Sequence, residues 1–321
     1  MKYKNVVISK IVSVALLIAI ILSLPFFPYS AQAADKQSKI EPATSVSLFT
    51  QVIEAKELVT WYQTDFPPYL ILDGQSKGNG IDDRIGKYII QRMPEYDYTY
   101  KVANYSRILV ELKKQNPGVA TPFFKTPERE QYILYSDIAS YLILPNRLII
   151  RRVDIEKYQP FLLSDGTVDI EAMCNSGLFE IGISKGRSYY GILDEMIKKY
   201  KDTNVFHVRS GANHLGLLEM VKNGRIDSAF GFPVEIKYAD LEADLKALQV
   251  AKMVRFIPVF FGVPKNDWGQ NLVGKLNTIL KAEGTLAEFN SYYQFWLDET
   301  DKAYHQKLVQ EYYHEQLNKV P

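Results

Sequence analysis

The 321-residue sequence has few of the side chains that bind metals or form disulfides: one cysteine and four histidines. Because one thiol cannot form a disulfide within a chain, the fold must rest on its hydrophobic cores. The histidines show no H-E-x-x-H spacing and there is no C-x-x-C, so no metal site is predicted. Gly78-Asn79-Gly80 is not followed by Gly-Lys-Ser/Thr and is not a P-loop. We therefore expect no metal and no cofactor.

The chain also lacks an excess of charge of either sign. It has 38 lysines and arginines against 37 acidic residues, a formal net charge of +1. This balance implies neither a nucleic acid nor an anionic membrane as a partner. Hydrophobic residues make up 47% of the chain, which is ample for packed cores. Its length predicts about two domains.

The first 33 residues have the features of a cleavable signal peptide. Lys2, Lys4 and Lys10 precede an apolar run over residues 11–24, and Ala31-Gln32-Ala33 offers a small-x-small cleavage site. Cleavage leaves 288 residues and changes the net charge from +1 to −2, because three lysines are lost. A lipoprotein would have a cysteine at the cleavage site, and none is near it. We therefore expect a freely diffusing periplasmic protein. An uncleaved membrane anchor is the alternative.

Alternating strand and helix signals after residue 57 predict an α/β fold in two series. In the first series we expect strands at 58–62 and 96–102. We also expect a helix with apolar positions from Ile81 to Met93, a second helix capped by Ser106, and a third that starts at Thr126. The second has strands at 179–183, 205–208 and 226–230 with helices at 189–200 and 215–224, after a less regular crossing at 152–177. The apolar run at 254–263 leads back to the first series, and two long helices follow, through Leu272 to Leu280 and Tyr304 to Leu317.

An ordered set of short motifs runs through this pattern. The motifs are Val59-Thr60-Trp61-Tyr62-Gln63-Thr64-Asp65-Phe66-Pro67-Pro68-Tyr69, Gly80-Ile81-Asp82-Asp83, Thr126-Pro127-Glu128-Arg129 with Tyr135-Ser136-Asp137, Lys185-Gly186-Arg187-Ser188-Tyr189, Lys222-Asn223-Gly224-Arg225-Ile226-Asp227-Ser228-Ala229, and Glu283-Gly284-Thr285-Leu286 with Trp296. In this order they resemble the family 3 extracellular solute-binding proteins, typified by the periplasmic amino-acid binders. The resemblance covers residues 58–297.

This resemblance implies the type II periplasmic-binding-protein fold, in which two α/β lobes are joined by two crossing hinge strands. It places the first lobe at residues 34–147 and 255–321 and the second at 148–254. A small ligand is held between the lobes, which close around it. The expected partner is the membrane permease of an ABC importer, or alternatively a membrane sensor, and we expect a monomer.

Arg129 is the first candidate ligand-binding residue. In the amino-acid binders that this chain resembles, the arginine of the Thr-x-Glu-Arg segment holds the carboxylate of the ligand. A guanidinium suits that role because it makes a bidentate, charge-assisted contact with a planar carboxylate. The alternative is a surface arginine paired with Glu128 or Asp137.

Aromatic residues form the second candidate group. Phe66 and Tyr105 align with the rings that enclose the ligand in the family, and ring faces offer large contact areas at little entropic cost. Where the family has small hydroxyl residues, this chain has Pro122-Phe123-Phe124, which makes Phe124 a candidate as well. Since 13% of the sequence is aromatic, core packing is the competing explanation.

The turn Lys185-Gly186-Arg187-Ser188 is the third candidate, and it follows a predicted strand. We expect it to open the next helix, so that its free backbone N–H groups and the helix dipole favour an anion. In the family this turn contributes to the carboxylate site, and Ser188 takes the place of the usual threonine. A plain turn is the alternative.

Phe232 marks a departure from the family. Amino-acid binders have an aspartate at this position, which holds the ammonium group of the ligand, and Glu235 is the nearest acid that could replace it. A buried ammonium without an anionic partner costs several kcal/mol. We therefore expect a carboxylate-bearing, flat or apolar small molecule rather than an ordinary α-amino acid.

Two enzymatic alternatives remain open from the sequence. Gly182-Ile183-Ser184-Lys185-Gly186 matches the G-x-S-x-G pattern of serine hydrolases, with His207, His214, His305 or His314 as possible bases. Neither an HGGG-type oxyanion segment nor a signature around any histidine accompanies it. Some proteins of the resembled fold are dehydratases, but no acid–base pair is evident here. We expect a binding protein and no enzyme.

Overall fold

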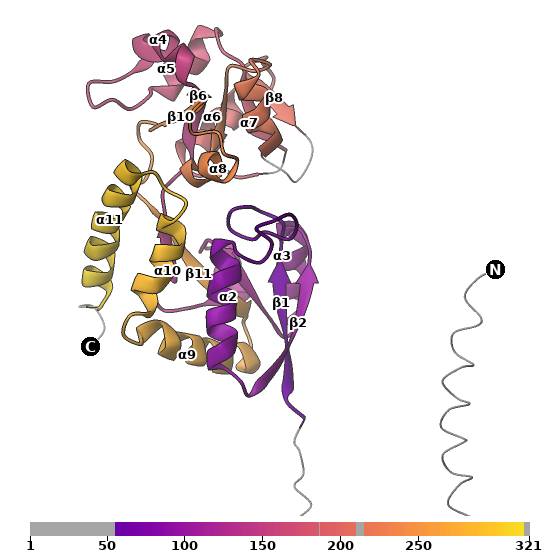
Figure 1. The fold of residues 1–321 in the computed structure, drawn as a ribbon. Helices are drawn as coiled ribbons and strands as arrows, with labels where there is room; N and C mark the ends of the chain where they lie inside the picture. Colours follow the sequence, from indigo (N-terminus) through magenta and orange to yellow (C-terminus); the bar gives the residue numbers. More distant parts are fainter. Residues whose placement is uncertain (1–54, 186, 210–214, 318–321) are drawn as a thin grey trace, which may run out of the picture. The chain divides into compact units, whose positions relative to one another are not determined.

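The computed structural model describes residues 55–185, 187–209 and 215–317. The expected signal peptide and its cleavage site lie outside the described residues. The described chain forms two β-sheets, each flanked by helices (Figure 1). Among its helices, none combines the length and apolar character needed to cross a membrane.

The first sheet has the strand order β2-β1-β3-β11-β4, and β5 also pairs with β11. Its strands are β1 (Glu57–Gln63), β2 (Tyr96–Val102), β3 (Gly118–Phe123), β4 (Ile133–Tyr135), β5 (Tyr141–Ile143) and β11 (Ile257–Pro264). β1 runs parallel to β2 and β3, whereas β11 is antiparallel to β3, β4 and β5. The apolar run at 254–263 thus returns to the first sheet, as its sequence predicted.

The helices of the first lobe come from two stretches of the chain, one before and one after the residues of the second sheet. They are α2 (Ile81–Arg92), α3 (Tyr105–Lys113), the 3₁₀ turn η1 (Arg129–Gln131), α9 (Asp267–Lys281), α10 (Thr285–Gln294) and α11 (Glu299–Leu317). The prediction that Ser106 caps a helix is wrong. Asn104 is the N-cap of α3, because its side-chain oxygen accepts a hydrogen bond from the Arg107 N–H at 2.9 Å. This shift makes Tyr105 the first helical residue.

The second sheet has the order β10-β6-β9-β7-β8. Its strands are β6 (Arg147–Arg151), β7 (Ile181–Ser184), β8 (Phe206–Arg209), β9 (Ser228–Gly231) and β10 (Leu245–Leu248). β7 is parallel to β8 and β9, and β6 is antiparallel to β9 and β10. Two segments, residues 144–146 and 249–256, connect the two sheets. This is the two-lobed type II fold with two crossing segments.

The helices of the second lobe differ from expectation in two places. They are α4 (Ile155–Tyr158), α5 (Ile170–Ser176), α6 (Ile192–Lys199), α7 (Leu215–Lys222) and α8 (Pro233–Tyr238), with 3₁₀ turns η2 (Arg152–Asp154) and η3 (Gln159–Phe161). The segment 152–177 is therefore largely helical and carries the buried Cys174 in α5. The helix after β7 begins at Ile192, not near Lys185.

The core of the first lobe extends to the start of α8. Trp61, Ile85 and Phe261 are buried in this core, and so are Phe232 and Val234, which follow strand β9 of the second lobe. Phe232 is only 4% exposed. The two lobes therefore share apolar contacts at the position where a ligand-binding residue was expected.

Candidate functional site

Aromatic rings from both lobes meet in one cluster. Phe66, in the loop after β1, packs edge-to-face against Tyr105 at 6.3 Å and against Phe232 at 6.4 Å between ring centroids. It also stacks on Tyr69 at 5.1 Å. Such pairs contribute about 0.5–1.5 kcal/mol each beyond the area they bury. The structure thus brings together three of the aromatic positions singled out in the sequence, and adds Tyr69.

Arg187 extends from the loop after β7 into this cluster. Its guanidinium carbon lies 5.1 Å from the ring centroid of Phe66 and 5.0 Å from that of Phe232. The ring of Tyr189 is also 5.0 Å away. These distances are within the ~6 Å range of cation–π attraction. A side chain of the second lobe is therefore in contact with a ring of the first.

Two polar groups hold the Arg187 guanidinium in place. Nη1 donates to Oε1 of Glu235 at 3.1 Å, and Nη2 donates to Oδ1 of Asn146 at 3.2 Å. The other oxygen of Glu235 accepts from the Phe232 N–H at 2.7 Å, at the start of α8. Burial raises the pKa of the fully buried Glu235, and the adjacent guanidinium offsets part of that effect. Glu235 is therefore already engaged with a cation of its own chain.

Arg129 lies in η1 and is partly buried. Its Nη1 donates to the carbonyl oxygen of Phe124 at 3.1 Å, and its guanidinium lies 5.5 Å from the ring centroid of Phe123. Among the described residues no carboxylate is within salt-bridge distance of it, and Asp137 pairs instead with Lys281 at 3.2 Å. The predicted alternative, a surface pair with Glu128 or Asp137, is thus not formed.

Tyr105 packs against the rings that lie next to the two arginines. Burial raises the pKa of its phenol, the nearby carboxyl of Asp82 raises it further, and Arg187 and Arg129 both lower it. Tyr105 packs on Phe123 at 6.1 Å and on Phe66 at 6.3 Å, the two rings over which Arg129 and Arg187 lie. Arg187 is paired with Glu235, so Arg129 is the cation of this cluster that would attract an anion.

Phe124 joins the site through its backbone as well as its ring. Its carbonyl oxygen accepts from Arg129 and also from the Tyr135 hydroxyl at 3.2 Å. Its ring packs edge-to-face on Tyr190 of the second lobe at 6.4 Å. Tyr190 has a left-handed φ of 71°, so the loop that presents it is tightly constrained.

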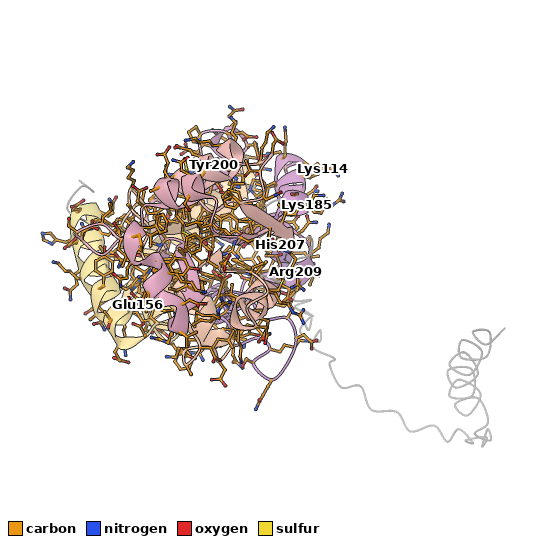
Figure 2. All side chains as sticks on the ribbon, turned by 90° about the horizontal axis from the view of Figure 1, so that it is seen from above. Lys114, Glu156, Lys185, Tyr200, His207 and Arg209 are labelled. Atoms are coloured by element: carbon orange, nitrogen blue, oxygen red, sulfur yellow. The ribbon has the colours of Figure 1, made fainter. Side chains whose placement is uncertain are left out.

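Lys185 and Ser188, the other described residues of the predicted turn, do not join Arg187 in the aromatic cluster. Lys185 is exposed, as Figure 2 also indicates, and Gly186 lies outside the described residues. The Ser188 hydroxyl donates to Oδ2 of Asp194 at 2.5 Å, and the same carboxylate accepts from the N–H groups of Tyr189 and Tyr190. The prediction that this turn opens a helix is wrong, because the Asp194 carboxylate folds residues 188–190 into a loop ahead of α6. The helix-dipole argument for an anion therefore does not apply here.

A buried carboxyl beneath the cluster had not been singled out as functional. Asp82, in α2, is fully buried and accepts hydrogen bonds from Thr121 Oγ1 and the Tyr141 hydroxyl, both at 2.8 Å. Burial raises its pKa to about 7, although the two donated hydrogen bonds lower it. A pKa near 7 means that this carboxyl changes its charge close to neutral pH.

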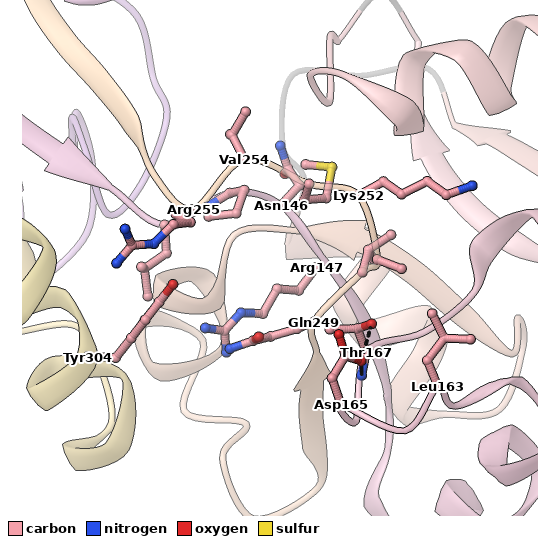
Figure 3. A pocket seen from close by; sticks show the side chains of 15 residues that line it. Asn146, Arg147, Leu163, Asp165, Thr167, Gln249, Lys252, Val254, Arg255 and Tyr304 are labelled. Carbon is pink, nitrogen blue, oxygen red and sulfur yellow. Dashed lines mark hydrogen bonds between the residues drawn. The ribbon is translucent and has the colours of Figure 1, made fainter.

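A cleft of about 390 Å³ lies at the two crossing segments (Figure 3). Residues 144–147 and 249–255 line it, together with Leu163, Asp165, Thr167 and Tyr304 of α11. Arg147, in its lining, makes two hydrogen bonds to Asp301 of α11, at 2.8 and 2.6 Å. This cleft therefore belongs to the hinge, whereas the arginine and aromatic cluster belongs to the contact between the lobes.

Comparison with known proteins identifies the family. The model of "Bacterial extracellular solute-binding proteins, family 3" matches residues 58–299, about three quarters of the chain. The chain therefore belongs to this family, as its motifs suggested.

Individual relatives are distant. The L-cystine-binding protein TcyK of Bacillus subtilis is 23% identical over 211 residues, 64% of this chain and 70% of the relative. Among solved structures, a putative L-cystine ABC transporter from Listeria monocytogenes matches with a TM-score of 0.55 and 20% identity, over 76% of this chain and 97% of that one. An ancestral arginine-binding protein bound to arginine matches with a TM-score of 0.54 and 17% identity, over 76% and 99%. The solved structures support the fold.

Proposed function

We propose that this family 3 solute-binding protein acts in the periplasm, after cleavage near Ala33, and captures a small carboxylate-bearing molecule between its lobes. Lobe 1 would comprise residues 34–147 and 255–321, and lobe 2 residues 148–254. The captured molecule is delivered to the permease of an ABC importer. The observation that carries this proposal is that Arg129 and Arg187 lie over two rings of one aromatic cluster. The Arg129 guanidinium lies 5.5 Å from the ring centroid of Phe123 and that of Arg187 5.1 Å from the ring centroid of Phe66. Tyr105 packs on both rings, at 6.1 and 6.3 Å.

Charge and shape support an anionic ligand. Arg129 has no carboxylate within salt-bridge distance among the described residues, so its guanidinium offers charge-assisted donors to a carboxylate. The ring of Phe123 lies beside it at 5.5 Å, and Tyr105 packs on Phe123 and on Phe66. Phe232 replaces the aspartate expected for an ammonium group, and Glu235 is paired with Arg187. An ordinary α-amino acid would therefore place its ammonium group near cations, with the nearest acid, Glu235, already paired.

The distant relatives make L-cystine the first compound to test. Both TcyK and TcyJ of Bacillus subtilis are described as L-cystine-binding proteins. L-Cystine carries carboxylates, which suit Arg129, but also two ammonium groups, which suit this site less well. The experiment is native mass spectrometry of the mature protein for a co-purified molecule, followed by calorimetry with L-cystine and with carboxylic acids that lack an amino group. Failure of every carboxylate to bind would contradict the proposal.

Delivery to a membrane sensor is the alternative outcome, since closure of the lobes presents a new surface in either case. Cross-linking the ligand-saturated protein in membranes separates the two: an importer predicts capture of a permease and a sensor predicts capture of a receptor. We expect the protein to act as a monomer in both.

Catalysis has less support than binding. Ser184 ends β7, and its N–H donates to the Tyr189 hydroxyl at 2.7 Å. His207 lies opposite Gly182 in the neighbouring strand and contacts Glu180 at 2.9 Å, while His305 contacts the carbonyl of Leu142. His214 lies outside the described residues. A fluorophosphonate probe that labelled Ser184 would favour a hydrolase instead.

A further inference from the structure

The contact between the lobes contains a complete environment for a guanidinium group. Three rings surround the Arg187 guanidinium at 5.0–5.1 Å, from Phe66, Tyr189 and Phe232. One carboxylate, from Glu235, and one amide oxygen, from Asn146, accept its hydrogen bonds. Rings with a carboxylate are what recognition of a free guanidinium requires. We call these five residues the guanidinium cage.

The two polar side chains of the cage are buried and oriented in a way that requires a cation at this position. The Glu235 side chain has no exposed surface, so its charge needs a partner at this position. The Asn146 amide donates from Nδ2 to the carbonyl of Tyr189 at 3.0 Å, which turns its oxygen toward Arg187. The Arg187 side chain is itself only 12% exposed.

We propose that Arg187 fills, from within the chain, a guanidinium-binding site between the lobes and thereby excludes cationic ligands. A free arginine, guanidine or amine would have to displace a tethered cation that is already paired with the one carboxylate of the cage. An anion held by Arg129 would not have to displace Arg187. This inference rests on the proposed function for the location of the ligand, and it makes Arg187 the residue that determines the charge of that ligand.

The cage also joins the lobes. Phe66 belongs to the first lobe, whereas Glu235 and Phe232 follow strands of the second. Since Phe66 reaches Arg187 only when the lobes are in contact, this side chain stabilises their contact without any ligand. Removal of its guanidinium should therefore both vacate a site and weaken the closed arrangement.

The test is chemical rescue of Arg187→Ala in the mature protein. We expect the variant to melt at a lower temperature than the wild type, and millimolar methylguanidinium to restore about 2–5 °C, as saturation of one site does. Methylammonium and urea are the matched controls, since the first lacks the planar group and the second the charge. The double variant Arg187→Ala/Glu235→Gln should lose the rescue, because the carboxylate of the cage is gone.

Two results would overturn the inference. One is a folded Arg187→Ala protein that methylguanidinium does not stabilise. The other is binding of L-arginine or methylguanidinium to the wild type as tightly as to the variant, since a filled site has no room for them. If Arg187→Ala does not fold, calorimetry with L-arginine on the wild type and on Arg187→Lys replaces the rescue experiment. The inference requires that neither protein binds L-arginine, and binding by either one would overturn it.

This test is independent of the natural ligand and of Arg129. Rescue with no carboxylate binding would retain the guanidinium cage and reject the proposed function. Carboxylate binding that depends on Arg129, with no rescue, would retain the proposed function and reject the guanidinium cage.

Discussion

Arg147 and Asp301 form a buried bidentate ion pair between the first residue of β6 and the last helix, with contacts of 2.8 and 2.6 Å. Both side chains are less than 10% exposed. The pair fixes α11 to the start of β6, at the hinge cleft. It therefore connects the C-terminal helix to the segment about which the lobes would rotate.

Removal of one member of this pair should destabilise the protein strongly. Asp301→Ala leaves the Arg147 guanidinium buried without its partner, for which we expect a loss of about 3–5 kcal/mol in the free energy of unfolding. Urea titration measures it. Lys302→Ala on the same helix is the control, because its pair with Glu299 is exposed and 3.8 Å long, and it should change stability by less than about 0.5 kcal/mol. Equal effects of the two would show that the buried pair is not structural.

Arg129→Ala should reduce ligand affinity and leave stability almost intact. Loss of charge-assisted hydrogen bonds to a carboxylate should weaken binding about 10- to 100-fold. The melting temperature should change little, because the Phe124 carbonyl keeps its hydrogen bond from Tyr135. Calorimetry with the identified ligand and a thermal melt measure the two effects.

Tyr135→Phe is the matched control for this variant, since it removes the other donor to the same carbonyl and leaves the guanidinium in place. It should retain the wild-type affinity. A large loss of stability in Arg129→Ala would instead mark Arg129 as a structural residue.

Phe232→Asp should raise the affinity for ordinary α-amino acids. It introduces a carboxylate for the ligand's ammonium group, at a cost in stability, because the lost ring is 4% exposed and packs on Phe66 and Tyr69. Calorimetry with a panel of amino acids compares this variant with Phe232→Leu, which stays apolar and should gain nothing. Tight binding of a standard amino acid by the wild type, with no improvement in Phe232→Asp, would refute the preference for ligands without an ammonium group.

Asp82 should make the protein less stable as the pH rises from about 4 to about 7. Its pKa is raised from 3.8 to about 7, so in this range the folded state holds a proton that the unfolded state has released. Stability falls by up to ~1.4 kcal/mol per pH unit where only the folded state is protonated, and the loss is complete above the folded pKa. Urea titrations at several pH values measure the slope.

Asp82→Asn removes this titrating group and keeps an acceptor for Thr121 or Tyr141. Its stability should vary less with pH between about 4 and 7 than that of the wild type. An unchanged slope would mean that another group is responsible.

Much of the fold was readable from periodicity and turn residues. The strand at 96–102 and the helix that starts at Ile81 agree with β2 and α2, because their apolar spacing and glycine signals are unambiguous. The start of the helix after β7 was not readable, because its loop is held by the Asp194 carboxylate three residues into α6. Ser106 was mistaken for a cap because Asn104 two residues earlier fits the same signal.

The site was only partly readable. Phe66, Tyr105 and Arg187 were identified through family motifs, and the structure brings them together. Asn146 carried no signal, since it acts through a contact with Arg187, 41 residues away in sequence. The role of Arg187 as a caged cation likewise depends on three rings from distant segments, which no local pattern encodes.

The single cysteine of this protein has a practical consequence. The Cys174 thiol is 3% exposed, and burial raises its pKa to about 11, so thiol reagents at neutral pH find little thiolate to attack. Cysteines introduced on the exposed faces of the two lobes could therefore carry a pair of fluorophores without prior removal of the native residue. Energy transfer between such labels would follow opening and closing in real time, in an otherwise unmodified chain.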